Sequence, residues 1–194
     1  MPNPAGLTPP RPWAFLTDAE LNLLKPYFTH GGAGRPMHDL RARLDAIFWA
    51  VTHNGPWRDL PAEMGPWDTA SRQFRRWAHK GVWTHLLKAA SRRASPLHPL
   101  LHWLCRAFRR AWRILGLEGI RLARRLGLHS ALRGPLWMLP DPDLSDQLLP
   151  TILARVRACI GRPARVILPI LRAARSFHFV VGGRPWVPRA LAPP

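Results

Sequence analysis

The chain has 194 residues and a formal net charge of +18 at pH 7, from 29 Lys or Arg against 11 Asp or Glu. Its two cysteines, Cys105 and Cys159, are too few for a disulfide framework or a four-ligand zinc site. No stretch reaches the roughly 18 uninterrupted apolar residues of a spanning helix, and the proline-rich start lacks the apolar run of a signal peptide. We therefore expect a cytoplasmic protein without a membrane span.

The positive charge is concentrated in the second half of the chain. Residues 1–90 have a balance of +4 and residues 91–194 a balance of +14. Such a field attracts polyanions, so nucleic acid is the first partner to consider and an anionic membrane surface the second. Lysine occurs only at positions 25, 80 and 88. This preference for arginine also fits a GC-rich coding region, which would leave part of the charge as solvated surface.

Residues 1–15 are expected to be a disordered arm, because prolines at positions 2, 4, 9, 10 and 12 remove amide donors. Thr17 and Glu20 have the spacing of a capping box, and Leu21, Leu24 and Phe28 follow at helical spacing. The pattern predicts a first helix that ends at about Lys25, where Pro26 loosens it. Residues 30–36 are glycine-rich and predict a loop.

The next predicted elements are a long helix, a short turn and two further helices. An apolar stripe predicts the long helix, and it consists of Met37, Leu40, Leu44, Ile47, Phe48 and Val51. Three polar residues, Asp39, Arg41 and Asp45, lie off the stripe. The helix is expected to end at Asn54–Gly55 in a left-handed conformation. A helical turn is expected over residues 60–64. The following helix should start at Asp68 or Thr69 as N-cap and end at Lys80–Gly81, with a last helix over 82–90.

A helix, a short turn and another helix in a basic chain predict a helix-turn-helix DNA reader. On a helical wheel, Ala70, Phe74 and Trp77 lie on one side of the helix after Pro66 and the basic residues lie opposite. Trp57, Trp67, Phe74 and Trp77 should stabilise the fold. The predicted base or phosphate contacts are Arg72, Arg75 and Arg76, with Ser71, Gln73 and His79 beside them and with Arg35 and Lys80 as phosphate contacts. A solvated polar face is the alternative.

Several segments of this region also carry a family resemblance. They are Leu16–Glu20, Gly34–Pro36, Asp39–Arg41, Ala46–Phe48, Gly55, Trp57–Pro61, Pro66–Trp67, Phe74–Trp77 and Gly81–Trp83. In this order and spacing they resemble the N-terminal domain of a large insertion-sequence transposase family, over residues 16–90. The resemblance implies a helical domain that binds the ends of an insertion element.

The same resemblance implies a following RNase H-like nuclease domain, in which two aspartates and a glutamate bind two metal ions. After residue 90 the chain has only Glu118, Asp141, Asp143 and Asp146 as acidic residues, and no alternating strands. We therefore expect no nuclease activity, no metal and no cofactor. Asp141 and Asp143 are interpreted as a turn before a helix capped by Ser145 or Asp146, rather than as a paired-carboxylate site.

Three groups with metal-ligand chemistry, His98, His102 and Cys105, share one helical face. A half-buried helix face is preferred over a zinc site, because no fourth ligand follows. A cationic amphipathic helix is predicted over 98–115, with Leu101, Leu104, Phe108, Trp112 and Leu115 on one face and Arg106, Arg110 and Arg113 on the other. A second basic stretch follows at 120–132. Residues 144–159 and 164–175 are further helix candidates that Pro150, Pro163 and Pro169 interrupt.

Three interpretations of the tail, residues 91–181, stay open. It is a helical extension that packs on the first domain or pairs with a second chain, a basic helix that contacts DNA or membrane, or an out-of-frame product of a decayed transposase gene. Residues 182–194 are expected to be a disordered end.

The sequence as a whole predicts an all-α protein with a helix-turn-helix domain at 16–90 that recognises insertion-element ends, in a catalytically incomplete or truncated transposase. Its expected partners are DNA and either a homodimer mate or a full-length transposase. One alternative is a membrane-surface protein with an inert transposase-derived module. Another is an active transposase whose nuclease half comes from a second reading frame.

Overall fold

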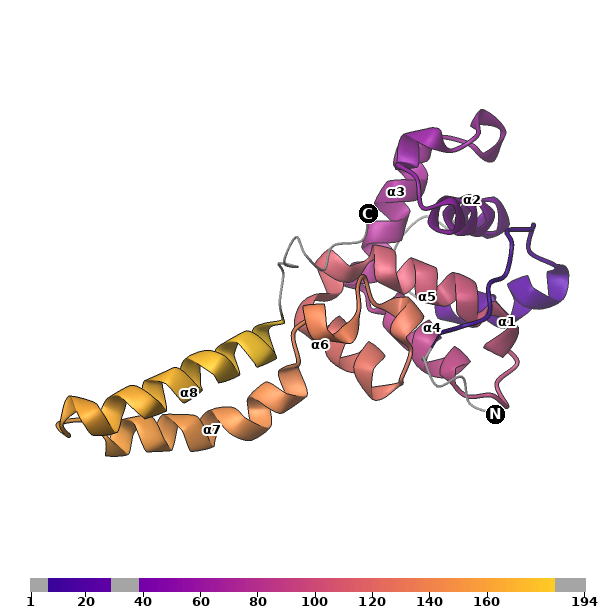
Figure 1. Ribbon diagram of the computed structural model, residues 1–194. Coiled ribbons are helices and arrows are strands. Elements are labelled where there is room, and N and C mark those ends of the chain that lie inside the picture. The colour runs from indigo at the N-terminus through magenta and orange to yellow at the C-terminus, as the bar shows by residue number, and fades with distance from the viewer. Residues whose placement is uncertain (1–6, 29–38, 184–194) are drawn as a thin grey trace.

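The computed structural model describes residues 7–28 and 39–183. Every regular element in these ranges is helical, so the predicted all-α fold is confirmed. The α-helices of the described ranges are α1 (Asp18–Phe28), α2 (Leu40–His53), α3 (Trp67–His79), α4 (Val82–Ser91), α5 (Leu101–Arg110), α6 (Trp112–Arg125), α7 (Pro142–Ala158) and α8 (Ala164–Gly182). Figure 1 shows α1 to α6 gathered in one body, from which α7 and α8 project as a hairpin.

Helix α1 starts with the predicted capping box. The Thr17 backbone N–H donates to the Glu20 carboxylate at 3.0 Å, and the Glu20 N–H donates to the Thr17 hydroxyl at 3.2 Å. The helix continues to Phe28 rather than ending at about Lys25. Pro26 lies in its last turn, where it removes only one backbone hydrogen bond.

Helix α2 has the predicted C-terminus, since Asn54 adopts a left-handed conformation with φ 58°. Asp39 is its N-cap and accepts a hydrogen bond from the Ala42 N–H at 2.8 Å. The prediction that Asp45 lies off the buried stripe was wrong, because its exposed fraction is only 5%. The segment before α1 covers this face of α2, and the Leu16 N–H donates to the Asp45 carboxylate at 2.9 Å. Met37 and residues 30–36 lie outside the described residues.

Two single-turn 3-10 helices, η1 (Trp57–Asp59) and η2 (Ala62–Met64), connect α2 to α3. The second agrees with the predicted turn over 60–64. Helix α3 starts at Trp67, and its N-cap is Pro66 without a capping side chain, rather than Asp68 or Thr69. Asp68 lies in the first turn instead, where its negative charge interacts favourably with the unpaired N–H groups of the helix start.

Trp83 of α4 lies at the centre of an aromatic core. It is 1% exposed, and its ring centroid lies 5.1 Å from Phe74, 5.9 Å from Phe28 and 6.1 Å from Trp77. Its indole N–H donates to the Phe74 carbonyl at 3.2 Å. Helices α1, α3 and α4 are thus packed around one side chain.

The hydrophobic core continues past residue 90. One cluster of buried side chains extends from Leu16 to Leu132, and α5 contributes a continuous buried face. The Trp103 ring of α5 lies 5.3 Å from the Phe48 ring of α2. Residues on both sides of the predicted boundary at 90 therefore share a core.

The predicted helix over 98–115 consists of a 3-10 turn at His98–Leu100, helix α5, and the start of α6. Gly116 interrupts α6 with φ 57°. Arg110, expected on the solvent face of this helix, turns inward. It donates to the Ala50 carbonyl at 3.3 Å and to the Gly55 carbonyl at 2.9 Å, so it caps the end of α2.

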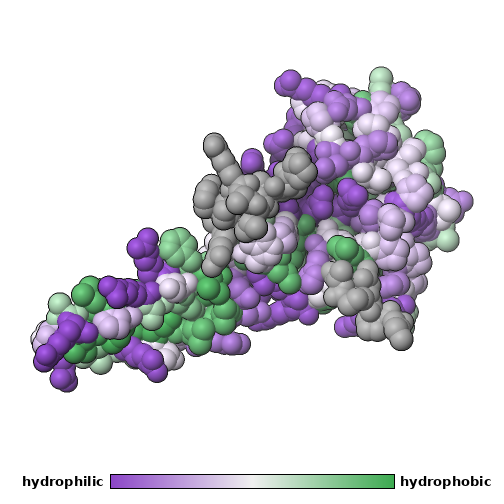
Figure 2. All heavy atoms as spheres, viewed as in Figure 1, coloured by the Kyte–Doolittle hydropathy of each residue, from purple (hydrophilic) through white to green (hydrophobic). Residues whose placement is uncertain are grey.

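Helices α7 and α8 pack on each other and expose apolar side chains along their length. Contrary to prediction, neither Pro150 nor Pro169 interrupts its helix. Each proline lies inside a continuous helix, and both are exposed. Figure 2 shows apolar surface alternating with polar surface along this hairpin. The exposed apolar residues include Leu148, Leu149, Leu153, Val166, Leu168, Leu171, Phe179 and Val180. No helix in the described ranges is long and apolar enough to cross a bilayer.

Residues 7–17 lack regular secondary structure but contact the helical body. The Thr8 N–H donates to the Ser130 hydroxyl at 2.8 Å, and the Trp103 indole N–H donates to the Arg11 carbonyl at 3.3 Å. The Arg11 side chain pairs with Glu20 at 2.6 Å. The part of the predicted disordered arm that is described is therefore packed. Residues 1–6 and 184–194 lie outside the described residues.

Candidate nucleic-acid interface

Helix α3 has one buried and one exposed basic face, as its wheel predicts. Ala70, Phe74, Trp77 and Ala78 are buried, with exposed fractions of 3% or less. The opposite side, which we call the basic face of α3, consists of Arg72, Gln73, Arg75, Arg76, His79 and Lys80; all are exposed except the half-buried Gln73. The buried aromatic side fixes the rotation of the helix and so directs the basic face outward.

Ser71 differs from the other predicted contacts because it is only 1% exposed. Its hydroxyl accepts a hydrogen bond from the Arg75 guanidinium at 3.1 Å. The structure therefore places Ser71 behind Arg75, where it orients that side chain. Helical-wheel spacing alone does not show whether Ser71 contacts DNA or supports Arg75, since a serine side chain is small enough to be covered by its neighbours.

The arginines of the basic face have different charge environments. Arg72 forms an ion pair with Asp68, one turn earlier on the same helix. Within the described residues, Arg75 and Arg76 form no ion pair with a carboxylate. Arg75 and Arg76 therefore carry most of the uncompensated positive charge of this face. Arg35, the remaining candidate, lies outside the described residues.

Aromatic and arginine side chains in contact hold the connection between α2 and α3. The Trp57 ring lies 5.3 Å from the Phe74 ring, and the Arg110 guanidinium lies 4.5 Å from the centre of the Trp57 ring. Trp67 was expected to stabilise the fold as well, but it is 40% exposed, with Arg58 at 5.5 Å from its ring. Trp57 positions the start of α3, and Trp67 stays on the surface.

The acidic residues after residue 90 all face arginines of α6. Asp141 contacts Arg124 at 3.1 Å, Asp146 contacts Arg121 at 2.6 Å, and Asp143 contacts both Arg125 at 2.7 Å and Arg121 at 3.3 Å. Glu118 contacts Arg121 at 3.4 Å. The Arg125 hydrogen bond and charge hold the pKa of Asp143 below its usual range. The three aspartates thereby join α7 to α6.

The N-cap residue of α7 differs from the predicted one. Asp141, rather than Ser145 or Asp146, is the N-cap, and its carboxylate accepts from the Leu144 N–H at 3.1 Å. Pro142 then occupies the first helical position, which favours a helix start because proline lacks the N–H that would be unpaired there.

The three groups considered for metal binding each have other contacts. The His98 ring contacts the Ala90 carbonyl at 3.0 Å, and the His102 ring contacts the Thr8 hydroxyl at 3.5 Å. Cys105 is buried, and burial raises the pKa of its thiol to about 12. In the described ranges no three His, Cys, Asp or Glu side chains are grouped as a metal site would require.

Sequence reasoning missed a second group of basic side chains. Arg106 and Arg109 of α5 and Arg133, which follows the 3-10 turn η4 (His129–Ala131), line the same hollow in the surface. The helical pattern groups Arg106 with Arg110 and Arg113, and nothing in the sequence links Arg106 to Arg109 and Arg133.

The fold and the basic face of α3 define an all-helical domain with one exposed basic helix face. A family model described as "Putative transposase of IS4/5 family" matches residues 16–87. The chain is also 31% identical over 91 residues to "Uncharacterized protein y4sN" of Sinorhizobium fredii (strain NBRC 101917 / NGR234), which covers 46% of this chain and 69% of that protein. The chain therefore contains an N-terminal transposase-like domain over residues 16–87. No solved structure matches it.

Proposed function

We propose that this protein binds DNA at the ends of an insertion element, with the basic face of α3 as the contact surface. One observation carries the proposal: Arg75 and Arg76 are exposed on a helix whose opposite side is fixed in the core by Phe74 and Trp77. A helix held in this way can enter the major groove without refolding. The match of residues 16–87 to a transposase family supports DNA as the partner.

Arginine suits both parts of such a contact. Its guanidinium donates two parallel hydrogen bonds to the edge of guanine, and it also pairs with phosphate oxygens. Arg75 is restrained by Ser71, which reduces the side-chain entropy that binding would cost. Arg76, His79 and Lys80 follow toward the end of the helix, where they would reach the phosphate backbone. Arg75 is therefore the strongest candidate for reading a base.

We further propose that the 194 residues do not cleave DNA themselves. Two-metal cleavage needs carboxylates that are free to bind cations. The four carboxylates after residue 90 are instead in contact with guanidinium groups of α6. A full-length transposase, or a nuclease half encoded in a second frame, would then supply the chemistry. A homodimer stays a prediction, which light scattering of the purified chain would test.

Fluorescence anisotropy with the full chain tests the DNA proposal. The full chain is needed because α5 belongs to the same core as α2 and α4. Duplexes would carry the terminal sequence of the insertion element that encodes the chain, or a scrambled version, across a salt series. Variant Arg72→Ala/Arg75→Ala/Arg76→Ala would be compared with Arg155→Ala/Arg157→Ala/Arg165→Ala, which removes the same charge from exposed positions of the hairpin.

Selective loss of terminal binding in the α3 variant is the expected result. The slope of log K against log salt should also become less steep, by about 0.9 for each phosphate that the variant no longer neutralises. Equal weakening by both variants, on both duplexes, would reduce the interaction to nonspecific charge and overturn end recognition by α3.

A second candidate function rests on the hairpin of α7 and α8. Its exposed apolar residues, such as Leu168 and Leu171, alternate with Arg165, Arg172 and Arg175. Basic amphipathic helices with this composition bind anionic lipid surfaces. Flotation with liposomes that contain phosphatidylserine tests this role. Co-flotation that Leu168→Ser/Leu171→Ser abolishes would support it, and absence of the wild type from the lipid fraction would refute it.

A further inference from the structure

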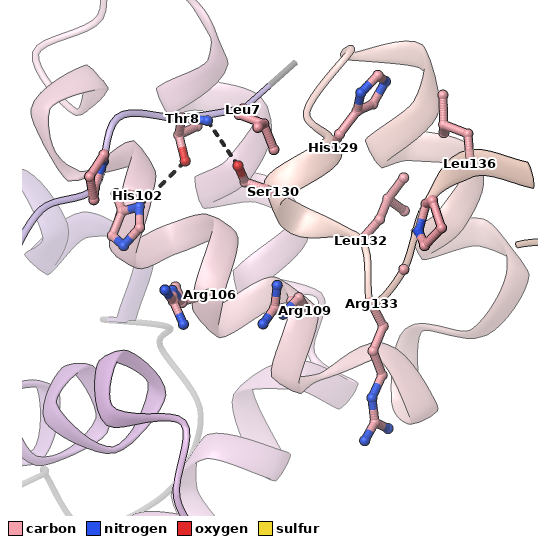
Figure 3. A pocket seen from close by; sticks show the side chains of 13 residues that line it. Leu7, Thr8, His102, Arg106, Arg109, His129, Ser130, Leu132, Arg133 and Leu136 are labelled. Atoms are coloured by element: carbon pink, nitrogen blue, oxygen red, sulfur yellow. Dashed lines mark hydrogen bonds between the residues drawn. The ribbon is translucent and has the colours of Figure 1, made fainter. Parts of the chain in front are cut away.

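A cleft lined by arginines lies beside α5, away from the residues assigned to the DNA contact. It has a volume of about 610 Å³ and is formed by the side of α5 that carries His102, Arg106 and Arg109, and by residues 129–136 opposite. Figure 3 shows Arg106 and Arg109 on α5 and the Arg133 side chain extending from the segment opposite. A neighbouring hollow of about 420 Å³ shares the same three arginines and reaches Asn54–Pro56.

The walls of the cleft are fixed by contacts between distant parts of the chain. The Thr8 N–H donates to the Ser130 hydroxyl at 2.8 Å, and the Thr8 hydroxyl lies 3.5 Å from the His102 ring nitrogen. Figure 3 shows that these two contacts link Thr8 to both walls of the cleft. Leu132 is 4% exposed and attaches the opposite wall to the core. The arginine positions are thus set by packed backbone rather than by a loose loop.

Positive charge in the cleft has no acidic counterpart among the residues that the structure describes. In the described ranges, Arg106, Arg109 and Arg133 make no ion pair, and no Asp or Glu lines either hollow. Burial lowers the pKa of Arg109, and the charges of Arg106 and Arg133 lower it further. The arginines of α6 differ, since Arg121, Arg124 and Arg125 each contact a carboxylate.

Nearby Arg110 shows what a structural arginine looks like in this fold. It donates to two backbone carbonyls and lies against Trp57. Among the described residues, Arg106 and Arg109 have no comparable partner, and Arg133 has a ring contact at 5.1 Å from Trp112. Three guanidinium groups that lie near one another without a nearby carboxylate repel each other, which raises the free energy of the folded state. A bound anion would lower that free energy again.

We propose that this cleft binds the phosphate groups of a nucleotide unit, either in a nucleic-acid strand or as a free nucleotide. Each of the three guanidinium groups can donate paired hydrogen bonds to phosphate oxygens, and such charged hydrogen bonds are the strong ones. Leu7, Pro135 and Leu136 supply an apolar wall of the kind that a sugar or base can contact. This site is separate from α3 and does not depend on α3 entering a groove.

Calorimetry and anisotropy with the full chain test the proposal. The probes are ATP, for the free nucleotide, and a short labelled single-stranded oligonucleotide of mixed sequence, for the strand. The cleft variant is Arg106→Ala/Arg109→Ala/Arg133→Ala, and the matched control is again Arg155→Ala/Arg157→Ala/Arg165→Ala. Arg133→Glu alone serves as a second cleft variant, because Arg133 is exposed and its replacement leaves the core intact.

Both cleft variants should bind one or both probes about tenfold or more weakly than the control variant, since each removes charged hydrogen bonds to phosphate. Loss restricted to the oligonucleotide identifies a strand as the ligand, and loss restricted to ATP identifies a free nucleotide. The α3 variant should keep binding the preferred probe, whatever its effect on terminal duplex. Equal affinities of Arg133→Glu and the control for both probes would overturn the proposal, as would the absence of any binding by the wild type.

Discussion

The guanidinium group of Arg110 lies 4.5 Å from the centre of the Trp57 ring. Arg110 belongs to α5, and Trp57 belongs to the connection that leads into α3. The same guanidinium donates hydrogen bonds to the carbonyls of Ala50 and Gly55 at the end of α2. Helix α5 therefore stabilises the geometry between the two helices of the proposed DNA-binding unit.

Replacement of Arg110 by Met should destabilise the protein by about 2–4 kcal/mol, because it removes two hydrogen bonds from a charged donor and a cation–π interaction. Denaturation by urea measures the change. Arg113→Met is the control, since Arg113 is exposed and its variant should lie within about 0.5 kcal/mol of the wild type. Equal midpoints for the two variants would show that α5 does not support the end of α2.

Trp83→Ala should lower the free energy of unfolding by about 3–5 kcal/mol, because it leaves a large cavity between α1, α3 and α4. Trp83→Phe keeps a ring but removes the hydrogen bond to the Phe74 carbonyl, so a smaller loss is expected. Thermal unfolding followed by circular dichroism orders the two variants. Trp137→Ala is the control, since that side chain is 55% exposed. A loss at Trp137 as large as that at Trp83 would contradict this account of the core.

Asp45 should make stability depend on pH in a defined direction. Burial raises the pKa of Asp45 above its usual value of 3.8, although the Leu16 N–H and the Arg41 charge act against it. Between the unfolded and the folded pKa the folded state binds more protons than the unfolded state. The contribution of Asp45 to stability is therefore full below the unfolded pKa and is lost as pH rises through the folded pKa.

Asp45→Asn should remove this component, because the amide oxygen still accepts from the Leu16 N–H but does not ionise. The stability of this variant should rise relative to that of the wild type as pH increases. Urea denaturation measures it, from the pH range in which carboxyl groups titrate up to neutral pH. Asp45→Ala should instead cost about 1–3 kcal/mol, since it leaves the Leu16 N–H unpaired. A pH profile of Asp45→Asn parallel to that of the wild type would refute the assignment.

Asp143→Asn should loosen the hairpin of α7 and α8 without unfolding the body. Asp143 contacts Arg121 and Arg125, and the charge interactions that it makes are reduced when it is neutral. Hydrogen exchange measured by mass spectrometry should show faster exchange in α7, with unchanged protection in α2 and α4. Gln147→Ala, an exposed position of the same helix, is the control. Unchanged exchange in α7 would show that apolar contacts alone fix the hairpin.

Ser71→Ala should weaken DNA binding only through Arg75, because the buried Ser71 hydroxyl accepts from that guanidinium. A double-mutant cycle with Arg75→Ala measures this coupling. The effect of Ser71→Ala on the dissociation constant is expected to disappear when Arg75 is already Ala. Equal effects in both backgrounds would mean that Ser71 acts independently of Arg75.

Local patterns were sufficient to predict much of the domain. The capping box at Thr17 and Glu20, the left-handed residue Asn54 and the two faces of α3 follow from spacing and backbone preference, and the structure has them where they were predicted. The family resemblance over residues 16–90 is likewise contained in short segments. The DNA contacts themselves stay predictions, with Ser71 placed behind Arg75 rather than beside it.

Tertiary packing decided the features that depend on distant partners. Asp45 is buried because the segment before α1 crosses it, Arg110 turns inward because the end of α2 offers carbonyl groups, and Arg133 joins Arg106 and Arg109 because η4 packs on α5. Helical periodicity describes one element at a time, so it assigns a polar residue to solvent unless a second element covers it. The sequence alone thus determined most of the helix pattern of residues 16–90 and the resemblance to a transposase domain, while the arginine cleft and the core across residue 90 came from contacts between elements far apart in the chain.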